Sequence, residues 1–320
     1  MRVACGFVTI LVILHLGNPC TDRKYENFGH DHTMCMEPKK CNANKKLIEI
    51  NYILTAHERA ALLDIHNKLR ALVAFGRIPG HPPARNMQQL TWDDELASVA
   101  QRWAEQCMFE HDKNRRVERF RVGQNLAFSW QSPPNRDKSA DVINSTIAMF
   151  NEVNKPGFPS AYIGKFQPVP KTGHYTQIVW AESTLIGCGH AIYSETKKNI
   201  PGETKLLVCN FGRAGNMIGA EVYKTGMPEC EVPSNHYTGL CTTKDVNTKF
   251  EDPCDKREFN ALYPALCDND LFEALGIYGI TPSMNKWLLG SILFISAAGF
   301  LGLLYFTYCT WPRLKLCKRT

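Results

Sequence analysis

The histidine best placed for chemistry lies in the run Gly-His-Tyr-Thr-Gln-Ile-Val-Trp, residues 173–180. An imidazole transfers protons near neutral pH and binds transition metals, so His174 is the first candidate for a functional residue. The residues from Tyr175 to Trp180 alternate in a way that is typical of a half-buried strand. We therefore predict a strand over 176–180 that holds His174 at its entrance. The alternative is that His174 only caps this strand and bonds a backbone carbonyl.

Signatures of other enzymes are missing from the sequence. His57-Glu58 begins like the zinc-binding helix of a metalloprotease, but Ala61 stands where the second histidine would be needed. The sequence contains no GxSxG nucleophile elbow, no phosphate-binding glycine loop and no dinucleotide fingerprint. We therefore expect no complete catalytic machinery of these kinds.

Two apolar segments predict how the chain is placed in the cell. Residues 1–17 have the length and composition of a secretory signal peptide. Residues 287–309 carry no charge and are long enough to cross a bilayer as a transmembrane helix. Basic residues follow, and the positive-inside rule places the tail 310–320 in the cytosol. The sequence thus predicts a type I membrane protein at the cell surface or in a secretory-pathway membrane, with an extracellular ectodomain.

The composition agrees with an extracellular globular protein. Of 320 residues, 44% are hydrophobic and 21% are charged, and the mild net charge of +6 does not indicate nucleic-acid binding in this compartment. Among thirteen cysteines, Cys5 leaves with the signal, and Cys309 and Cys317 lie at the inner membrane face. The remaining cysteines are even in number, which predicts a disulfide framework rather than a metal cluster.

The elements between residues 55 and 226 are helices followed by strands. Thr55 and Glu58 form a capping box at the start of a helix that runs to Gly76. The pair His66-Asn67 is expected to anchor this helix to its neighbours rather than to act in catalysis. Periodicity predicts further helices over about 91–107 and 140–154, and strands over 187–194 and 205–211, joined across 199–202. This order predicts an α+β fold.

Two cysteine-containing segments flank this body. Residues 18–54 are polar with few periodic apolar positions, which predicts an irregular N-terminal arm stapled to the body by cystines. From Met227 the composition becomes acidic, and four cysteines follow without a long periodic segment. Residues 227–286 are therefore predicted to form a small cystine-rich module and stalk.

Three motifs together resemble the CAP superfamily, which contains cysteine-rich secretory, insect antigen-5 and plant pathogenesis-related proteins. The motifs are the run 173–180, His66-Asn67-Lys68-Leu69-Arg70, and Val208-Cys209-Asn210-Phe211 with Gly215-Asn216. The resemblance covers residues 55–226, and the arm sequence His32-Thr33-Met34-Cys35 is most similar to the arthropod antigen-5 branch. It implies a CAP-type α-β-α sandwich, in which an antiparallel sheet lies between helices.

The resemblance also implies how the cysteines pair. Family pairs correspond to Cys20–Cys35, Cys41–Cys107 and Cys188–Cys209. A further family pair is missing at both ends, because Lys24 and Asn114 stand at its positions. The last four cysteines cluster beyond the final core strand and are expected to pair among themselves: Cys230, Cys241, Cys254 and Cys267.

The family's cleft is built around two histidines and two acidic residues, which bind a divalent metal in some members. These positions correspond to His111, Gln124, Glu152 and His174. Gln124 stands where many relatives have glutamate, and a neutral carboxamide is a poor zinc ligand and cannot act as a general base. The resemblance thus implies a weakened site that requires no cofactor, with His111 and His174 as candidate ligands for zinc or another divalent metal.

These observations favour a membrane-tethered, non-enzymatic extracellular binding protein that holds a lipid, a sterol or a protein partner. The alternatives are a metal-dependent hydrolase that uses His111, Glu152 and His174, and a secreted effector shed by cleavage within 227–286. The basic stretch Lys113–Arg121 forms either a solvated loop or a site for an anionic glycan. Asn144 begins the only N-glycosylation motif, so a glycoprotein is expected.

Overall fold

The computed structural model describes residues 20, 22–41, 45–48, 53–134 and 141–267. These residues form parts of two compact units, divided between Pro253 and Cys254, and each unit is described by itself. The predicted signal peptide 1–17, transmembrane helix 287–309 and cytosolic tail 310–320 lie outside the described residues and stay predictions. No helix within the described residues combines the length and the hydropathy needed to cross a bilayer.

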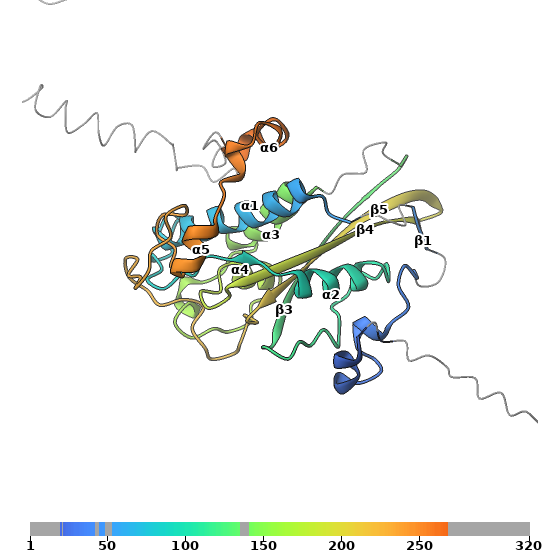
Figure 1. Cartoon of the computed structure of the whole chain (residues 1–320), viewed down its shortest axis with the longest axis horizontal. Coiled ribbons are helices and arrows are strands. Elements are labelled where there is room, and N and C mark those ends of the chain that lie inside the picture. Colours follow the sequence, from blue (N-terminus) through green and yellow to red (C-terminus); the bar gives the residue numbers. More distant parts are fainter. Residues whose placement is uncertain (1–19, 21, 42–44, 49–52, 135–140, 268–320) are drawn as a thin grey trace, which may run out of the picture. The chain divides into compact units, whose positions relative to one another are not determined.

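An antiparallel sheet lies at the centre of the first unit (Figure 1). Its strands follow the order β1-β4-β5-β3, and β2 pairs with β4 in parallel. The strand bounds are Lys46–Leu47 (β1), Thr91–Trp92 (β2), Val122–Gln131 (β3), Leu185–Lys197 (β4) and Ile200–Gly212 (β5). The predicted strands 187–194 and 205–211 are confirmed within β4 and β5. The predicted connection 199–202 is wrong, because Lys198 and Asn199, both with positive φ, make a two-residue hairpin turn.

Helices cover both faces of this sheet, as the CAP resemblance implied. The four main helices are Ala56–Ala74 (α1), Asp94–Ala104 (α2), Val142–Phe150 (α3) and Gly173–Ile178 (α4). Helix α2 packs against β4 and β5 on one face, while α3 and α4 contact β3 and α1 packs on α3 on the other face (Figure 1). The α-β-α sandwich is therefore confirmed.

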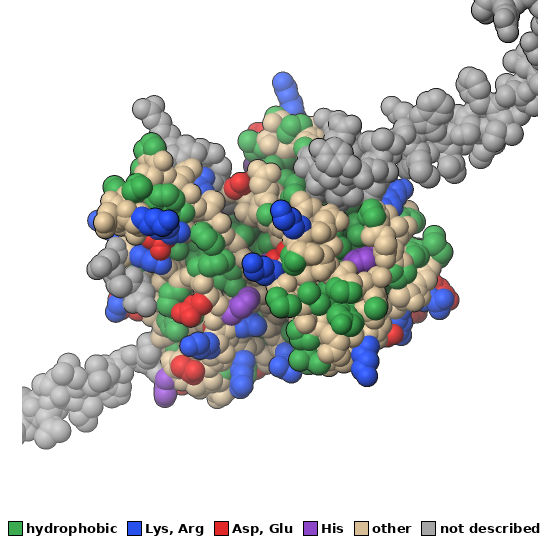
Figure 2. All heavy atoms as spheres, turned by 180° about the vertical axis from the view of Figure 1, so that it is seen from behind, with side chains coloured by type: hydrophobic (Ala, Val, Ile, Leu, Met, Phe, Trp, Pro, Cys, Tyr) green, Lys and Arg blue, Asp and Glu red, His purple; other side chains and the backbone are tan. Residues whose placement is uncertain are grey.

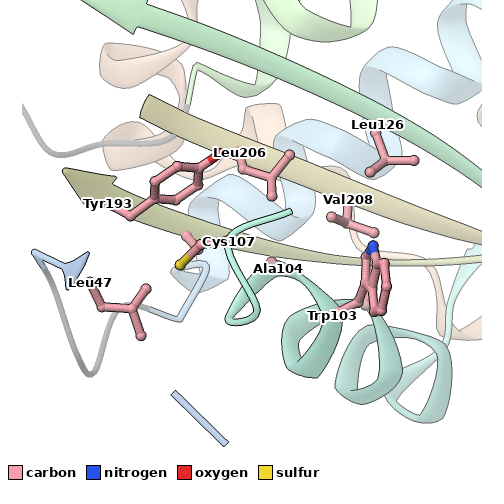
Figure 3. Packing of buried hydrophobic residues seen from close by; sticks show 10 residues of the cluster. Leu47, Trp103, Ala104, Cys107, Leu126, Tyr193, Leu206 and Val208 are labelled. Carbon is pink, nitrogen blue, oxygen red and sulfur yellow. The ribbon is translucent and has the colours of Figure 1, made fainter. Parts of the chain in front are cut away.

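Two glycines let α2 lie directly on the sheet. A Cβ atom built on Gly187 would lie 2.2 Å from the backbone nitrogen of Ala97, and one on Gly189 would lie 2.3 Å from the backbone of Gln101. Side chains on both sides of this contact form a buried core that includes Trp103, Leu126, Leu206 and Val208 (Figure 3). The close approach of backbones fixes the depth at which α2 packs.

The motif at residues 66–70 anchors α1, as predicted for its first two residues. Asn67 donates its Nδ2 to the Leu90 carbonyl at 3.0 Å and accepts the Leu90 amide at 2.7 Å. The capping box that was predicted at Thr55 and Glu58 is also present. Arg70 is fully buried, and its guanidinium donates to five backbone carbonyls, those of Gln88, Ile178, Trp180, Ala181 and Ser183. The motif therefore ties α1 to the segments that precede α2 and follow α4.

The strand predicted over 176–180 is wrong, because Gly173–Ile178 form helix α4. The alternation in polarity did not correspond to alternation in burial, since Tyr175, Thr176, Gln177 and Ile178 are all buried. The two polar side chains are satisfied inside the protein. Thr176 donates to Asn216 Oδ1 at 2.6 Å, and Gln177 accepts the Gly215 amide at 2.9 Å. The alternation of polar and apolar residues therefore did not indicate a strand here.

Strand β3, over Val122–Gln131, was not anticipated from the sequence. Its first residues, Gly123-Gln124-Asn125, are polar or lack a side chain, yet they are buried on both faces. Asn125 donates to the carbonyl of His174, and Gln124 donates to the side chain of Asn210. A strand with buried polar residues on both faces shows neither alternation nor an apolar run, so its pattern gave no signal.

The N-terminal arm is stapled to the body as expected, although part of it is regular. It contains two 3₁₀ helices, Arg23–Phe28 (η1) and Thr33–Cys35 (η2), as well as β1. His32 donates from Nε2 to the Arg116 carbonyl at 2.9 Å, and Thr33 donates to Asp112 Oδ2 at 2.5 Å. The arm therefore holds the loop that carries His111.

The ten cysteines expected outside the cell form five disulfides. These are Cys20–Cys35, Cys41–Cys107, Cys188–Cys209, Cys230–Cys241 and Cys254–Cys267. The three pairs that the resemblance implied are confirmed, as is the expectation that the last four cysteines pair among themselves, for which the sequence had left the partners open. Polar contacts occupy the place of the missing family pair. Lys24 Nζ lies 2.7 Å from Glu95 Oε1, and Asn114 Nδ2 donates to the Phe28 carbonyl and to Asp31. Non-covalent contacts thus link the arm to the body at these positions.

Residues 227–253 belong to the first unit, whereas the sequence suggested a module that begins at 227. The Cys241 amide donates to Met87, its carbonyl accepts the Gln89 amide, and Tyr237 donates to Asp64 at 2.9 Å. This segment includes helix Lys244–Lys249 (α5). The second unit contains α6, Arg257–Leu262, and α7, Pro264–Cys267, with the bridge Cys254–Cys267. The boundary therefore lies at Cys254.

Candidate ligand-binding cleft

Glu152 fixes both the backbone and the ring of His174. Its Oε2 accepts the amides of His174 and Tyr175 at 3.0 and 3.2 Å, at the start of α4. Its Oε1 lies 2.6 Å from Nδ1 of His174. Glu152 lies in the 3₁₀ helix Asn151–Val153 (η3), which continues α3, so the packing of α3 positions the carboxylate. Both carboxylate oxygens are therefore engaged in holding α4 and its histidine.

Gln124 fixes the ring of His111 and the backbone next to it. Its Oε1 lies 3.2 Å from Nδ1 of His111 and accepts the Asp112 amide at 2.9 Å. Its Nε2 donates to Asn210 Oδ1 at 3.0 Å. Gln124 is buried in β3, and Asn210 is buried in the neighbouring strand β5. The side-chain amide thus connects the sheet to the loop that carries His111.

These contacts determine the tautomer of each ring. The atoms facing Nδ1 are a carboxylate oxygen of Glu152 and an amide oxygen of Gln124, and both can only accept a hydrogen bond. Nδ1 must therefore carry the proton on His111 and on His174. In the neutral form, Nε2 is the lone-pair donor on each ring, which is how a histidine is commonly oriented for ligand binding.

The two histidines lie close enough to influence one another. The pKa of His111 is lowered from its ordinary value, mainly because part of the ring is removed from water. The positive charges of Arg115 and of protonated His174 lower this pKa further, while the hydrogen bond from Nδ1 to Gln124 opposes the shift. At neutral pH, His111 is therefore mainly neutral and its Nε2 is available to a ligand.

The residues present fit a metal ion only in part. Two imidazole nitrogens are oriented outward, but Glu152 and Gln124 act on the Nδ1 atoms behind them rather than as further ligands. Among the residues that the structure describes, no three His, Cys, Asp or Glu side chains converge as a metal site requires. Zinc or another divalent metal at His111 and His174 stays a prediction.

The basic stretch Lys113–Arg121 is not uniformly available to an anionic partner. Arg119 binds Asp93 and Glu95 at 2.8 and 2.9 Å. Arg115 donates to the backbone carbonyls of Val122 and Asp112. An anionic glycan would therefore depend on the exposed side chains of Lys113, Arg116 and Arg121. This partner stays a prediction.

The glycosylation motif lies on α3, as the sequence analysis implied. Asn144 is exposed, whereas Thr146 is buried and donates to the Val142 carbonyl at 2.8 Å. The exposed side chain of Asn144 is compatible with glycosylation. Glycosylation of Asn144 stays a prediction.

Comparison with known proteins assigns the family. The profile of the cysteine-rich secretory protein family, CAP, matches residues 63–211. Venom allergen 3 of Solenopsis invicta is 42% identical over 216 residues, which cover 65% of this chain and 89% of that protein. A venom allergen 3 homolog of Dinoponera quadriceps is 37% identical and covers 68% of this chain and 96% of its own length. The chain belongs to the CAP family.

A solved structure, "Crystal structure of NaASP2 with Zn2+", is 29% identical with a TM-score of 0.46, and the match covers 59% of this chain and 96% of that one. The venom-allergen relatives and the five disulfides agree with an extracellular location. The protein is accordingly an extracellular CAP protein.

Replacing Gln124 by glutamate should restore a charged cleft. We expect the pKa of His111 to rise, because a carboxylate that accepts from Nδ1 stabilises the imidazolium. Zinc binding, expected to be weak in the natural protein, should strengthen because the ring becomes more electron-rich and the cleft more negative. NMR titration of His111 and calorimetric zinc titration at pH 7.5 measure the two effects.

The matched control is Glu152→Gln, which neutralises the partner of the other histidine. It should leave the pKa of His111 nearly unchanged, because Glu152 does not contact that ring. Tight zinc binding by the natural protein that survives His174→Ala would contradict the assignment of this cleft as the metal site.

Proposed function

We propose that this CAP protein is a membrane-tethered extracellular module that holds a lipid, a sterol or a protein partner without transforming it. The observation that carries this proposal is how Glu152 and Gln124, the residues that hold the two histidines, are hydrogen-bonded. Glu152 makes three hydrogen bonds to α4, and Gln124 is a neutral amide bonded on both sides. A neutral amide cannot act as a general base, and the Glu152 carboxylate is held by three hydrogen bonds to α4, so the acidic pair of the family cleft is weakened as catalytic machinery.

The membrane tether rests on the sequence of residues 287–309 and its basic flank. Such an anchor would keep the binding module at the surface of the membrane. A form released by cleavage would keep the same cleft, so ligand binding does not depend on which form acts.

A metal-dependent hydrolase is the second candidate. It is favoured by the orientation of the two imidazoles, since Nδ1 of each ring is bonded and Nε2 is left for a ligand. A metal bound there would supply an activated water. The engagement of Glu152 by backbone amides is the reason to place this candidate second.

Ligand binding and turnover can be separated with one double variant, His111→Ala with His174→Ala. The full chain would be incubated with fluorescent sterol and fatty-acid probes, and in parallel with peptide and ester substrates. Saturable binding without turnover in both the natural protein and the double variant is the expected result. Turnover by the natural protein that falls by about a hundredfold or more in the double variant would instead establish catalysis.

A further inference from the structure

An exposed aromatic patch lies on the face of the sheet that α2 covers, beyond the end of that helix. Alternate residues of β3 point to one face, so Phe128 and Trp130 continue the row that begins with the core residue Leu126. In β5, Ile200 lies in the same row as the core residues Leu206 and Val208. In β3 and β5 the side chains on this face are therefore buried in the core at one end and lie at the surface near the β4–β5 turn.

Phe109, Phe128, Trp130 and Lys197 contact one another, and Phe109, Phe128 and Ile200 are exposed while Trp130 and Lys197 are half-buried. The rings of Phe109 and Phe128 are 4.3 Å apart and inclined by 58°, and these residues are 49% and 45% exposed. Ile200 is 51% exposed. Lys197 Nζ lies 4.7 Å from the ring centre of Phe128 and 5.7 Å from that of Trp130. We refer to Phe109, Phe128, Trp130, Lys197 and Ile200 as the hairpin patch.

Positive charge surrounds the hairpin patch. Lys198 in the turn is exposed, and Lys45, which precedes β1, lies 3.0 Å from Glu195. Glu195 also contacts Lys197 at 3.2 Å, so its charge is shared between two lysines. At this end of the sheet, on the left of Figure 2, exposed hydrophobic side chains lie beside Lys and Arg. Among the described residues, the lysines Lys45, Lys197 and Lys198 lie near the carboxylates of Glu195 and of Glu110, which follows Phe109.

This combination matches the chemistry of a membrane interface. Aromatic rings are favoured at the level of the lipid headgroups, and lysine side chains lay their methylenes on apolar surface while the ammonium stays among the phosphates. In the structure the ammonium of Lys197 lies over the rings of Phe128 and Trp130 as a cation–π contact. An excess of lysines is attracted to anionic lipid.

We propose that the hairpin patch docks on a lipid surface that carries anionic headgroups. Docking would hold the cleft of the CAP domain at a fixed orientation to that surface. The inference does not depend on the proposed ligand of the cleft, because it rests only on the contacts and charges of the hairpin patch itself.

The test uses the fluorescence of Trp130 in the full chain, mixed with vesicles whose acyl chains are brominated. The Trp130 signal is the difference between the natural protein and Trp130→Phe. This signal should be quenched by phosphatidylcholine vesicles that contain phosphatidylserine, and less by phosphatidylcholine alone. The double variant Lys197→Glu with Lys198→Glu should lower the quenched fraction on the order of tenfold, because each lysine near the surface adds about a fivefold preference for anionic lipid.

Three controls keep the test decisive. The signal of Trp92, obtained with Trp92→Phe, should not be quenched, because Trp92 precedes α2 and lies at the other end of that helix. The exposed Ile218→Ser should leave quenching of Trp130 unchanged, whereas Phe128→Ser should reduce it. Near-ultraviolet circular dichroism verifies that each variant is folded. A Trp130 signal that is equally unquenched in both lipid mixtures overturns the proposal, and the surface lysine variant settles the question even if Phe128→Ser does not fold.

Discussion

Replacing Arg70 by methionine should lower the free energy of unfolding by about 4 kcal/mol or more. The side chain has no carboxylate partner and is fully buried, and it satisfies five backbone carbonyls from two separate segments. Burial lowers the pKa of Arg70 to about 9, so the guanidinium is still charged at pH 7. Methionine fills a similar volume but leaves all five oxygens without a donor.

Denaturation in urea at pH 7.5 measures this effect. Arg70→Lys should also be destabilising, because a single ammonium cannot reach oxygens on both sides of a planar guanidinium. Arg116→Met is the matched control, since that side chain is exposed. A change smaller than about 1 kcal/mol for Arg70→Met would contradict the anchoring role, because one unsatisfied buried carbonyl alone costs as much.

Lowering the pH from 6.5 to 4 should remove several kcal/mol of stability through two buried histidines. Burial lowers the pKa of His66 and of His190 from 6.5 to about 4. Above pH 6.5 both rings are neutral in the folded and the unfolded chain. As the pH falls below 6.5, the unfolded chain binds protons that the folded protein excludes, so stability is lost until the folded pKa is reached. Each histidine contributes roughly 2–3 kcal/mol to this loss.

The free energy of unfolding, measured in urea at steps from pH 7 to pH 4, tests this expectation. Burial also raises the pKa values of Asp64 and Asp112, whose protonation favours the folded state and offsets part of the loss at the acidic end. His190→Gln should reduce the slope, and His30→Gln, at an exposed position, should not. A stability that stays constant between pH 6.5 and 5 would be inconsistent with two neutral buried rings.

Elements whose buried residues are apolar were predicted from the sequence, and elements whose buried residues are polar were not. The capping box at Thr55 and the apolar β4 and β5 follow simple rules of pattern, so their positions were predicted correctly. Strand β3 and helix α4 were not, because their buried positions include Gln124, Asn125, Thr176 and Gln177. Each of these is satisfied by a partner distant in sequence, and a local pattern cannot report such partners.

The same limit applies to the cleft. The family motif named His111, Gln124, Glu152 and His174, and the structure places these residues in two hydrogen-bonded pairs. The sequence did not show that Gln124 and Glu152 accept hydrogen bonds from Nδ1 of the two rings and leave Nε2 for a ligand. These roles follow only from the contacts in the structure. The role of Asn210 behind Gln124 was also invisible in the sequence, although Asn210 lies in the motif 208–211 that supported the resemblance.

The contacts of the N-terminal arm have a practical meaning for anyone who isolates this protein in pieces. The match to the family profile begins at residue 63, yet the loop that carries His111 is fastened from outside it, by His32, Thr33 and the bridge Cys41–Cys107. A fragment that begins at residue 63 would lose the contacts of the arm with the loop that carries His111. A recombinant form of this protein should therefore begin before Cys20.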